Sequence, residues 1–583
     1  AQIANGASAS VTQDGNTNLS TVTQNDGDAG LIDPQATVSQ TGDNNSSTVS
    51  QTADAAASTL AANVDQSDDD NISVVTQTAN AAGSGDLFVS VTQSNGATST
   101  ITQTANGASS VNQDAIVDQD GANTSTITQN FDNVGANTFF ASVTQSNDGN
   151  ISVIDQDDKG SDADANLSAT VTQTGMGNDS NVQQDNKNAT ANVIQSGNTN
   201  QSDVLQDGSG LTANVTQGGD GNTSVVSHLG GLNSTTTVNQ QGDDSFAFVN
   251  QDANARNDTA TVNQLLGSSG NTATIDQNGI SGLQSRSTAE IEQSGTDSES
   301  TITQNGTRND AFSSQSGADN TSFITQNGTG MTALEYNTAS VSQSGDDNIS
   351  SVTQNGNSNS ATVDQSADAS TSTVIQDGTS LVADVTQSGG AGNTSSVDQG
   401  GSNNQGTVTQ NGSNNASTIY QRSSGNVAFV DQIGDSAESQ VFQGDIGGGT
   451  NNFADVEQNG DNFSFVGQGT GSGNSATVRQ TNTGGALNTS NVSQGDFSPG
   501  NDNTAADIVQ VGTGNISNLT QQDTSALGGD NLAAVNQQGA DNNSAILQDG
   551  ALNSATVSQT SNANNASVTQ NGSGNSAIVS QGL

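Results

Sequence analysis

The chain has 583 residues, of which 29% are apolar and 3% aromatic, so a globular core of large side chains cannot be built from it. A net charge of −52, from 59 acidic and 7 basic residues, disfavours nucleic acid and anionic lipid as partners. The absence of cysteine excludes disulfides, thiolate metal sites and cysteine nucleophiles. No apolar run reaches the length of a transmembrane helix, so we expect no membrane insertion.

A single short unit recurs along the whole chain. Its pattern is Q-x-G-x-x-N-x-[A/S]-x-[V/I]-x-Q, and the glutamines that close successive units run from Gln13 and Gln24 to Gln570 and Gln581. There are 47 such positions, counting His228 in one of them, and 26 of the 46 intervals between them are 11 residues long. A disordered, prion-like chain has a similar composition but does not keep such a register, so the repeat argues against that alternative.

Each unit predicts one β-strand followed by one tight turn. Asn, Ala or Ser, Val or Ile, and Gln occupy alternate positions, and a period of two places their side chains on one face of a strand. The Gly and Asn residues that follow each Gln are typical of turns, because they adopt positive φ readily. We therefore predict an inward-facing structural ladder, which two units represent: Gln410, Asn415, Ser417, Ile419 and Gln421 in one, and Gln570, Asn575, Ala577, Val579 and Gln581 in the other.

Two features indicate that the structural repeat contains two strands. Four residues before the closing position, Ala occupies 20 of the 24 odd-numbered strands and Ser 20 of the 23 even-numbered ones. Eleven intervals are stretched to 15 residues or more, and ten of them follow an even strand; the interval that ends at Gln129 is the exception. We therefore predict an all-β fold, a two-sheet β-solenoid of about 23 strand-turn-strand rungs with amyloid-like cross-β stacking, forming one continuous domain over residues 1–583.

The ends of the chain suggest how copies associate. The first strand begins within ten residues of Ala1 and the last ends at Gln581, so we expect uncapped ends. An uncapped strand edge is a template for another chain, and head-to-tail addition gives an open filament. We predict that the protein's main partner is itself, with Val11, Gln13, Val579 and Gln581 at the polymerisation edges. The start at Ala1, without a signal-like stretch, fits a mature secreted chain.

The repeat resembles that of the curlin family, the subunits of curli fibres and of bacterial functional amyloid. The units QNGSNNASTIYQ (410–421) and QNGSGNSAIVSQ (570–581) carry the resemblance position by position. It implies a secreted, extracellular structural protein that forms a cell-surface fibre or biofilm matrix and supports adhesion and cell aggregation. It also implies two further partners, a nucleator protein and an outer-membrane secretion channel.

Several residues outside the ladder are candidates for a function. Four outward-facing aromatic side chains are expected to make lateral contacts between molecules: Phe246, Phe248, Phe463 and Phe465. Acidic turns, such as those at 68–70, 157–158 and 346–347, suggest at most weak Ca²⁺ binding, and we expect no other cofactor. His228, the only histidine, is expected to be structural because it replaces a ladder glutamine.

Other functions are less favoured by the sequence. Paired catalytic carboxylates need a pocket, and this repeat offers none, so we expect no enzyme and no catalytic residue. Thr-x-Thr pairs on the outer face, as at Thr100/Thr102 and Thr126/Thr128, are chemistry suited to ice binding, but only a small minority of the strands carry them and a flat array needs them in consecutive strands. The alternative to a fibre subunit is a monomeric β-solenoid stalk of a surface adhesin, either with or without a dependence on calcium.

Overall fold

The computed structural model describes residues 7–26, 34–53, 59–80, 85–106, 111–132, 137–158, 166–329, 336–444, 448–469, 471–495, 504–522 and 530–582. These residues fall into two units, Ala1–Asp297 (unit 1) and Ser298–Leu583 (unit 2). The prediction of one continuous domain over residues 1–583 stays a prediction.

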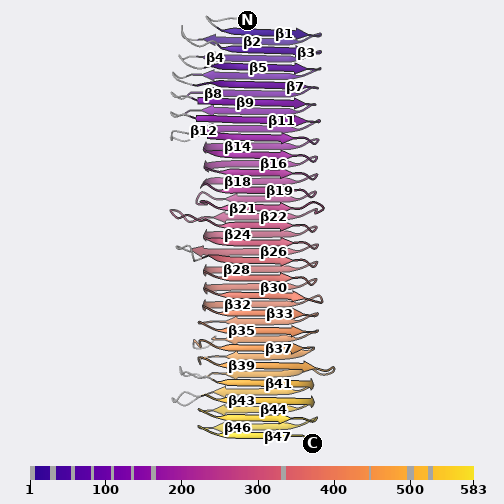
Figure 1. Ribbon diagram of the computed structural model, residues 1–583, viewed down its shortest axis with the longest axis vertical. Coiled ribbons are helices and arrows are strands. Elements are labelled where there is room, and N and C mark those ends of the chain that lie inside the picture. Colours follow the sequence, from indigo (N-terminus) through magenta and orange to yellow (C-terminus); the bar gives the residue numbers. More distant parts are fainter. Residues whose placement is uncertain are drawn as a thin grey trace. The chain divides into compact units, whose positions relative to one another are not determined.

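Unit 1 contains two sheets, one of odd-numbered and one of even-numbered strands (Figure 1). The odd sheet consists of β1 (Ser8–Asp14), β3 (Gln35–Thr41), β5 (Leu60–Ser67), β7 (Leu87–Ser94), β9 (Val111–Asp120), β11 (Asn137–Ser146), β13 (Asn166–Gln173), β15 (Ala189–Gln195), β17 (Thr212–Gln217), β19 (Thr235–Gln240), β21 (Thr259–Gln264) and β23 (Thr288–Gln293). The even sheet consists of β2 (Leu19–Asp26), β4 (Ser46–Ala53), β6 (Ile72–Ala79), β8 (Thr98–Ala105), β10 (Thr124–Phe131), β12 (Ile151–Asp158), β14 (Asp179–Lys187), β16 (Gln201–Ser209), β18 (Thr223–Leu232), β20 (Phe246–Gln251) and β22 (Thr272–Asn278).

Unit 2 has the same arrangement. Its odd sheet consists of β25 (Asn309–Gln315), β27 (Asn337–Gln343), β29 (Ser360–Gln365), β31 (Val382–Ser388), β33 (Gln405–Asn411), β35 (Val427–Ile433), β37 (Phe453–Asn459), β39 (Ser475–Asn482), β41 (Ala505–Thr513), β43 (Leu532–Ala540), β45 (Ser554–Gln559) and β47 (Ser576–Gln581). Its even sheet consists of β24 (Glu299–Thr307), β26 (Thr321–Thr329), β28 (Ile349–Asn357), β30 (Thr371–Thr379), β32 (Thr394–Ser402), β34 (Ala416–Gln421), β36 (Glu438–Gln443), β38 (Asn462–Gln468), β40 (Asn488–Gln494), β42 (Ile516–Gln522), β44 (Asn543–Asp549) and β46 (Asn565–Asn571).

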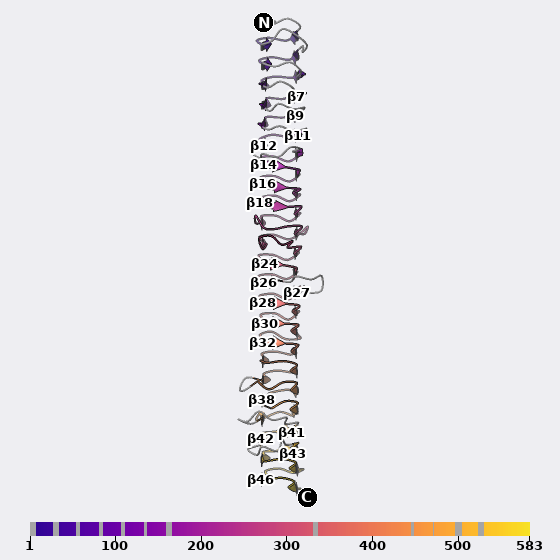
Figure 2. The same cartoon turned by 90° about the vertical axis from the view of Figure 1, so that its left-hand side faces the viewer.

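Within each unit, every strand pairs in parallel with the strand two places away in the chain. Val11 and Gln13 of β1, for example, lie opposite Val38 and Gln40 of β3. Seen end on, the strands form two layers, one from each sheet (Figure 2). The prediction of an all-β, two-sheet β-solenoid is confirmed, and the described residues contain no helix.

The interior is a thin layer between the two sheets. Along β29 buried and exposed residues alternate, so that Val363 is fully buried while Thr362 is exposed. The same alternation of burial recurs in other strands, for example β19 and β34. The period of two in the sequence therefore identifies the buried face, because successive side chains of a strand point to opposite sides.

The register of β9 corrects one part of the sequence prediction. Gln119 pairs with Gln93 of β7 and Gln145 of β11, so Gln119 is the residue of β9 that occupies the closing position. The stretched interval therefore runs from Gln103 to Gln119, after the even strand β8. The exception predicted for the interval that ends at Gln129 is wrong, because V-N-Q and V-D-Q both occur within β9 and only its pairing with neighbouring strands tells them apart.

Unit 1 has an additional apolar cluster at the edge where even strands end and odd strands begin. Phe131, two residues after the closing Gln129, meets Phe139 edge to face, with ring centroids 6.2 Å apart. Phe139 stands in the position that Asn occupies in most units. The sequence analysis missed this cluster, whose buried members are Val111, Phe131, Phe139, Leu167, Ala189 and Leu211.

Candidate functional site

The glutamine ladder links both rungs and sheets. In β33, the Gln410 amide nitrogen donates to Gln432 Oε1 at 2.8 Å, and Gln410 Oε1 accepts from Gln387 at 2.8 Å. The same nitrogen donates to the carbonyl of Thr394 in the facing sheet at 3.0 Å. Gln421 makes the equivalent contacts, with Gln443 at 2.7 Å. Each amide is fully buried, so each satisfies its polar atoms inside the stack.

The asparagine ladder holds the turns in place. The backbone N–H of Asn415 donates to Asn393 Oδ1 of the previous rung at 3.1 Å, and Asn415 Oδ1 accepts from the N–H of Ala437 in the next rung at 2.9 Å. Its amide nitrogen donates to the carbonyl of Gly434 at 2.8 Å. The turns stack so tightly that a side chain at Gly412, whose φ is +139°, would collide with the Gly434 carbonyl. These contacts explain why the pattern needs Gly and Asn at fixed distances from each Gln.

Ile419 and Ser417 fill the space between the two ladders. Ile419 is completely buried, and Ser417 is 3% exposed. The Ser417 hydroxyl is one of a line of buried serine hydroxyls in the even sheets that have no hydrogen-bond partner among the described residues. Elsewhere in this line, neighbouring serine hydroxyls form long, weak hydrogen bonds with each other, as between Ser99 and Ser73 at 3.3 Å. The apolar residues and the amides therefore supply the main inward contacts, and the serine hydroxyls add little.

The outermost described strands place ladder residues at a surface. Gln570 in β46 is 5% exposed and accepts a hydrogen bond from Gln548 at 2.8 Å. In β47, Ala577, Val579 and Gln581 are half-buried, although they keep the register of β45. Asn575, directly before this strand, is exposed. Val11 of β1 is 46% exposed, and Gln13 is exposed and hydrogen-bonds with Gln40. The role of these residues as polymerisation edges stays a prediction.

The outward aromatic residues form short columns on the sheets. In the even sheet of unit 2, Phe442 lies 5.8 Å from Tyr420 and 5.7 Å from Phe465, measured between ring centroids. The missing side chain of Gly467 gives Phe465 its space, because a Cβ there would lie 3.1 Å from the ring. Phe463 and Phe465 are half-buried, as is Phe248 in unit 1, and Phe246 is 37% exposed. Ring contacts within the chain therefore cover part of the aromatic surface. Lateral contacts between molecules through these aromatic residues stay a prediction.

Two arginines reinforce the outer faces of unit 2. Arg422 pairs with Asp398 through two hydrogen bonds of 2.9 Å, and its guanidinium lies 4.1 Å from the centroid of Tyr420. The bonds to Asp398 raise the pKa of Arg422, so the guanidinium stays charged. Arg479 lies within 4.0 Å of carboxylates on both neighbouring strands, Asp455 and Asp507. Basic residues thus offset part of the repulsion between stacked acidic side chains.

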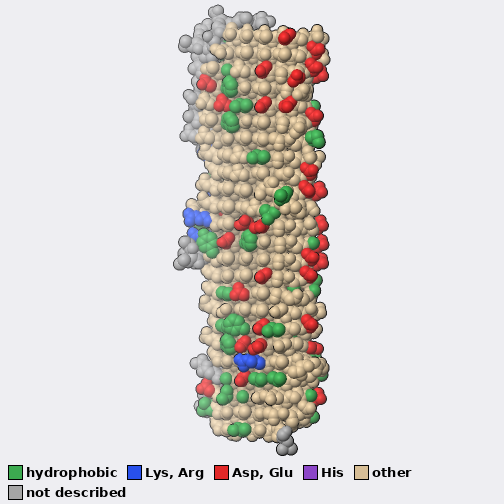
Figure 3. Space-filling model, turned by 45° about the vertical axis from the view of Figure 1, so that its right-hand side comes forward, with side chains coloured by type: hydrophobic (Ala, Val, Ile, Leu, Met, Phe, Trp, Pro, Cys, Tyr) green, Lys and Arg blue, Asp and Glu red, His purple; other side chains and the backbone are tan. Residues whose placement is uncertain are grey.

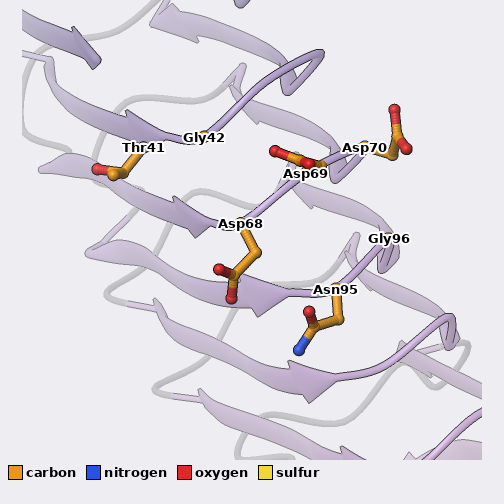
Figure 4. A pocket seen from close by; sticks show the side chains of 7 residues that line it. All are labelled: Thr41, Gly42, Asp68, Asp69, Asp70, Asn95 and Gly96. Carbon is orange, nitrogen blue, oxygen red and sulfur yellow. The ribbon is translucent and has the colours of Figure 1, made fainter. Parts of the chain in front are cut away.

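The acidic turns are built differently from a closed metal site. Figure 4 shows the recess lined by Thr41, Gly42, Asp68, Asp69, Asp70, Asn95 and Gly96, which has a volume of about 510 Å³. The three carboxylates point in different directions, and Asp69 Oδ1 accepts the N–H of Asp43 at 2.7 Å. Asp346 similarly accepts the N–H of Ala318 at 2.8 Å. Within the described ranges, no group of three or more acidic or histidine side chains is placed to hold a metal ion.

Acidic side chains also gather along one edge of the face in view in Figure 3. Asp157 and Asp158, the remaining acidic turn from the sequence analysis, lie at the end of β12. Asp158 is 2% exposed and points inward, whereas Asp157 accepts a hydrogen bond from Asn130 at 3.3 Å. Calcium binding by any of these turns stays a prediction.

His228 interrupts the glutamine ladder of unit 1. It lies between Gln206 and Gln251 in register and is fully buried. Its Nε2 lies 2.7 Å from the hydroxyl of Thr236, which stands where most odd strands have Ala. Burial lowers the pKa of His228 to about 4. The sequence analysis missed Thr236, although this departure from Ala in the strand after His228 was a visible signal.

The repeats place the chain in a family. Six segments match the family described as the curlin associated repeat, at residues 187–219, 295–328, 336–366, 449–481, 528–560 and 553–582. This is a curlin-repeat protein. The resemblance inferred from the sequence is thereby confirmed, and curlin-repeat proteins are structural, extracellular or surface-associated proteins. A comparison with curated proteins gives no match to the chain.

The curlin-repeat protein shows no membrane-spanning helix in the part of the chain that the structure describes: no helix there has the required length and hydropathy. Its repeated geometry consists of amide ladders, a thin apolar interior and stacked turns, all of which repeat from rung to rung. This geometry can hold strands in register over long distances, and it offers hydrogen-bonding partners to any further strand of the same sequence type.

Proposed function

We propose that this curlin-repeat protein is the structural subunit of an extracellular functional-amyloid fibre, curli-like, that assembles head to tail and serves biofilm matrix, surface adhesion and cell aggregation. The observation that carries the proposal is the constant register of the rungs. Val11 pairs with Val38 and Gln13 with Gln40 in the first rungs, just as Val557 pairs with Val579 and Gln559 with Gln581 in the last. A rung of one copy therefore presents the same partners as a rung of another.

The family match supports a structural function of this kind. The proposal also includes two partners. A curli-like fibre subunit is secreted through an outer-membrane channel and begins to assemble on a nucleator protein. Nothing in the fibre requires a cofactor, because the ladders are formed by the chain's own amides. The protein acts mechanically and has no catalytic residue.

Electron microscopy of the purified full chain tests the proposal. The protein is diluted from denaturant, with and without sonicated seeds of its own aggregates, and light scattering follows elongation. We expect filaments of uniform width and a shortened lag phase in the seeded sample. Isolated particles that never elongate, with or without seeds, would contradict assembly and favour the monomeric adhesin stalk. Repeating the measurement with Ca²⁺ and with a chelator tests the calcium dependence of that alternative.

A further inference from the structure

The outer face of the first five even strands carries a regular array of threonine side chains. We define the threonine face as the outward residues of β2, β4, β6, β8 and β10, from Leu19 to Asn130. Parallel pairing places Thr124, Thr126 and Thr128 of β10 directly opposite Thr98, Thr100 and Thr102 of β8. The two Thr-x-Thr pairs that lie two units apart in the sequence are therefore neighbours in one sheet.

The array continues across all five strands without a change of register. One column consists of Thr23, Ser50, Thr76, Thr102 and Thr128. Of the 20 outward positions in the four columns, 13 hold Thr and two hold Ser, and none is buried. The sequence prediction disfavoured such an array because few strands carry Thr-x-Thr pairs and these strands are not consecutive in the chain. In the structure, strands that are consecutive in the chain lie in different sheets, so neighbours in one sheet are two strands apart.

The spacing of the array is fixed by the backbone. Neighbouring strands lie about 4.8 Å apart, and residues two apart in one strand lie about 6.7 Å apart, so the face measures about 20 Å in each direction. In Figure 1 the strands of this part of unit 1 lie nearly parallel, so the columns stay aligned. Thr is β-branched and restricted at χ1, which holds each hydroxyl and methyl in a repeated orientation. The spacing between strands and the spacing along a strand are each close to a repeat distance between water oxygens in hexagonal ice.

The threonine face is also free of charge. None of its 20 positions is acidic or basic, although the chain carries 59 acidic residues. The next strand, β12, ends this region with Asp155 and Asp157 in the same columns. A charged group orders the surrounding water around itself, whereas neutral hydroxyl and methyl groups can fit into a lattice of water molecules.

We infer that the threonine face binds ice, with the methyl groups resting in the lattice and the hydroxyl groups hydrogen-bonding to its water molecules. A second copy of the chain is the competing occupant of a flat face. Dry packing against a second copy would bury at least 15 hydroxyl groups, and burying hydroxyls without partners is costly. Ice supplies a water partner to each of them. The inference does not depend on fibre assembly.

Ice affinity of the full chain tests this inference. Thermal hysteresis, crystal shaping and incorporation of the labelled protein into a slowly growing ice hemisphere are measured for the wild type and two matched variants. Thr126→Lys places a charged, protruding side chain between Thr124 and Thr128 on the threonine face, whereas Thr170→Lys changes an outward threonine at the same strand position in β13 of the other sheet. Circular dichroism verifies that each variant keeps its β content.

We expect the wild type and Thr170→Lys to shape ice crystals and enter the ice, and Thr126→Lys to lose both properties. Exclusion of the wild-type protein from ice would overturn the inference, as would full activity of a folded Thr126→Lys variant. Sedimentation adds an independent outcome. A dimer that depends on Thr126, from a protein that is excluded from ice, would assign the face to a second copy instead.

Discussion

The His228 imidazole has replaced an amide in the centre of a ladder, and its surroundings offer it no compensating charge. Thr236 faces it from the opposite sheet, and Gln206 and Gln251 lie above and below it in its own sheet. The groups packed against His228 are therefore neutral. Burial lowers the pKa of His228 from 6.5 to about 4, so the folded protein keeps the ring neutral in a pH range where the unfolded chain protonates it.

This difference predicts a specific loss of stability in acid. Between pH 6.5 and 4 the unfolded state gains a proton that the folded state does not bind, which costs about 3 kcal/mol by pH 4 and no more below it. His228→Gln should remove this part of the pH dependence, and adding Thr236→Ala restores the ordinary pair of side chains. Denaturant unfolding at pH 7 and pH 4 measures the effect. Equal pH dependence in wild type and His228→Gln would contradict it.

Asp258 changes stability with pH in the opposite direction to His228. It occupies the position of a ladder asparagine directly before β21 and is 1% exposed. It accepts hydrogen bonds from Ser285 Oγ at 2.6 Å and from the N–H of Ser287 at 2.7 Å. Burial is the main cause that raises its pKa to about 6, and the nearby Asp252 adds to it. The folded state therefore favours the protonated form, and stability is lost as the pH rises from 3.8 through 6.

Asp258→Asn should consequently stabilise unit 1 at pH 7, by up to about 3 kcal/mol, and should have little effect at pH 4. Asparagine restores the residue that most units hold at this position. Asp65→Asn, an exposed change in the middle of β5, is the matched control and should shift the unfolding free energy little at either pH. A stabilisation that is the same at both pH values would show that charge burial is not its cause.

At the level of the strand, the sequence predicts the fold well because two regularities are local. The period of two identifies the buried face, and the alternation of Ala and Ser identifies the sheet to which each strand belongs. Both can be read without knowing any contact. The structure reproduces them: Val363 is buried beside an exposed Thr362, and strands of equal parity pair.

What the sequence could not predict depends on contacts between rungs. Gln113 and Gln119 both follow an apolar residue by two positions, and only pairing with β7 and β11 selects Gln119. Ser313 replaces the usual Val or Ile, and its hydroxyl accepts a hydrogen bond from Ser300 of the facing sheet at 2.8 Å. The threonine face was missed for the same reason, since its strands are separated in the chain and adjacent only in the sheet.

The assignment of faces gives a direct mutational test. Val363 lies between Val341 and Val385 in register, so Val363→Asp places a carboxylate in an apolar layer and should destabilise unit 2 by about 3–5 kcal/mol. Thr362→Asp adds the same charge one residue away on the exposed face, where we expect a change below about 0.5 kcal/mol. Chemical unfolding and the yield of filaments are measured for both variants. Equal effects of the two substitutions would contradict the assignment of the inner and outer faces.

At the scale of the whole molecule, charge opposes assembly. The chain carries a net charge of −52, and many acidic residues lie in the turns that stack along the edges of the sheets. Two copies that meet end to end bring like charges together, whereas the inward ladders that would join them are neutral. Charge repulsion therefore slows the approach of two copies, whereas the amide and apolar contacts stabilise the joined copies once they meet.

Ionic strength should consequently control elongation. Screening shortens the Debye length from about 30 Å at 0.01 M salt to about 8 Å at 0.15 M, so the elongation rate should rise steeply over this range and then level off. Seeded light scattering at constant protein concentration measures the rate. Ice binding by the uncharged threonine face should change little with salt, at salt concentrations where ice binding and elongation can both be measured. An elongation rate that does not depend on salt would mean that charge repulsion does not limit the encounter of two copies. The slow step would then be the pairing of the incoming strands.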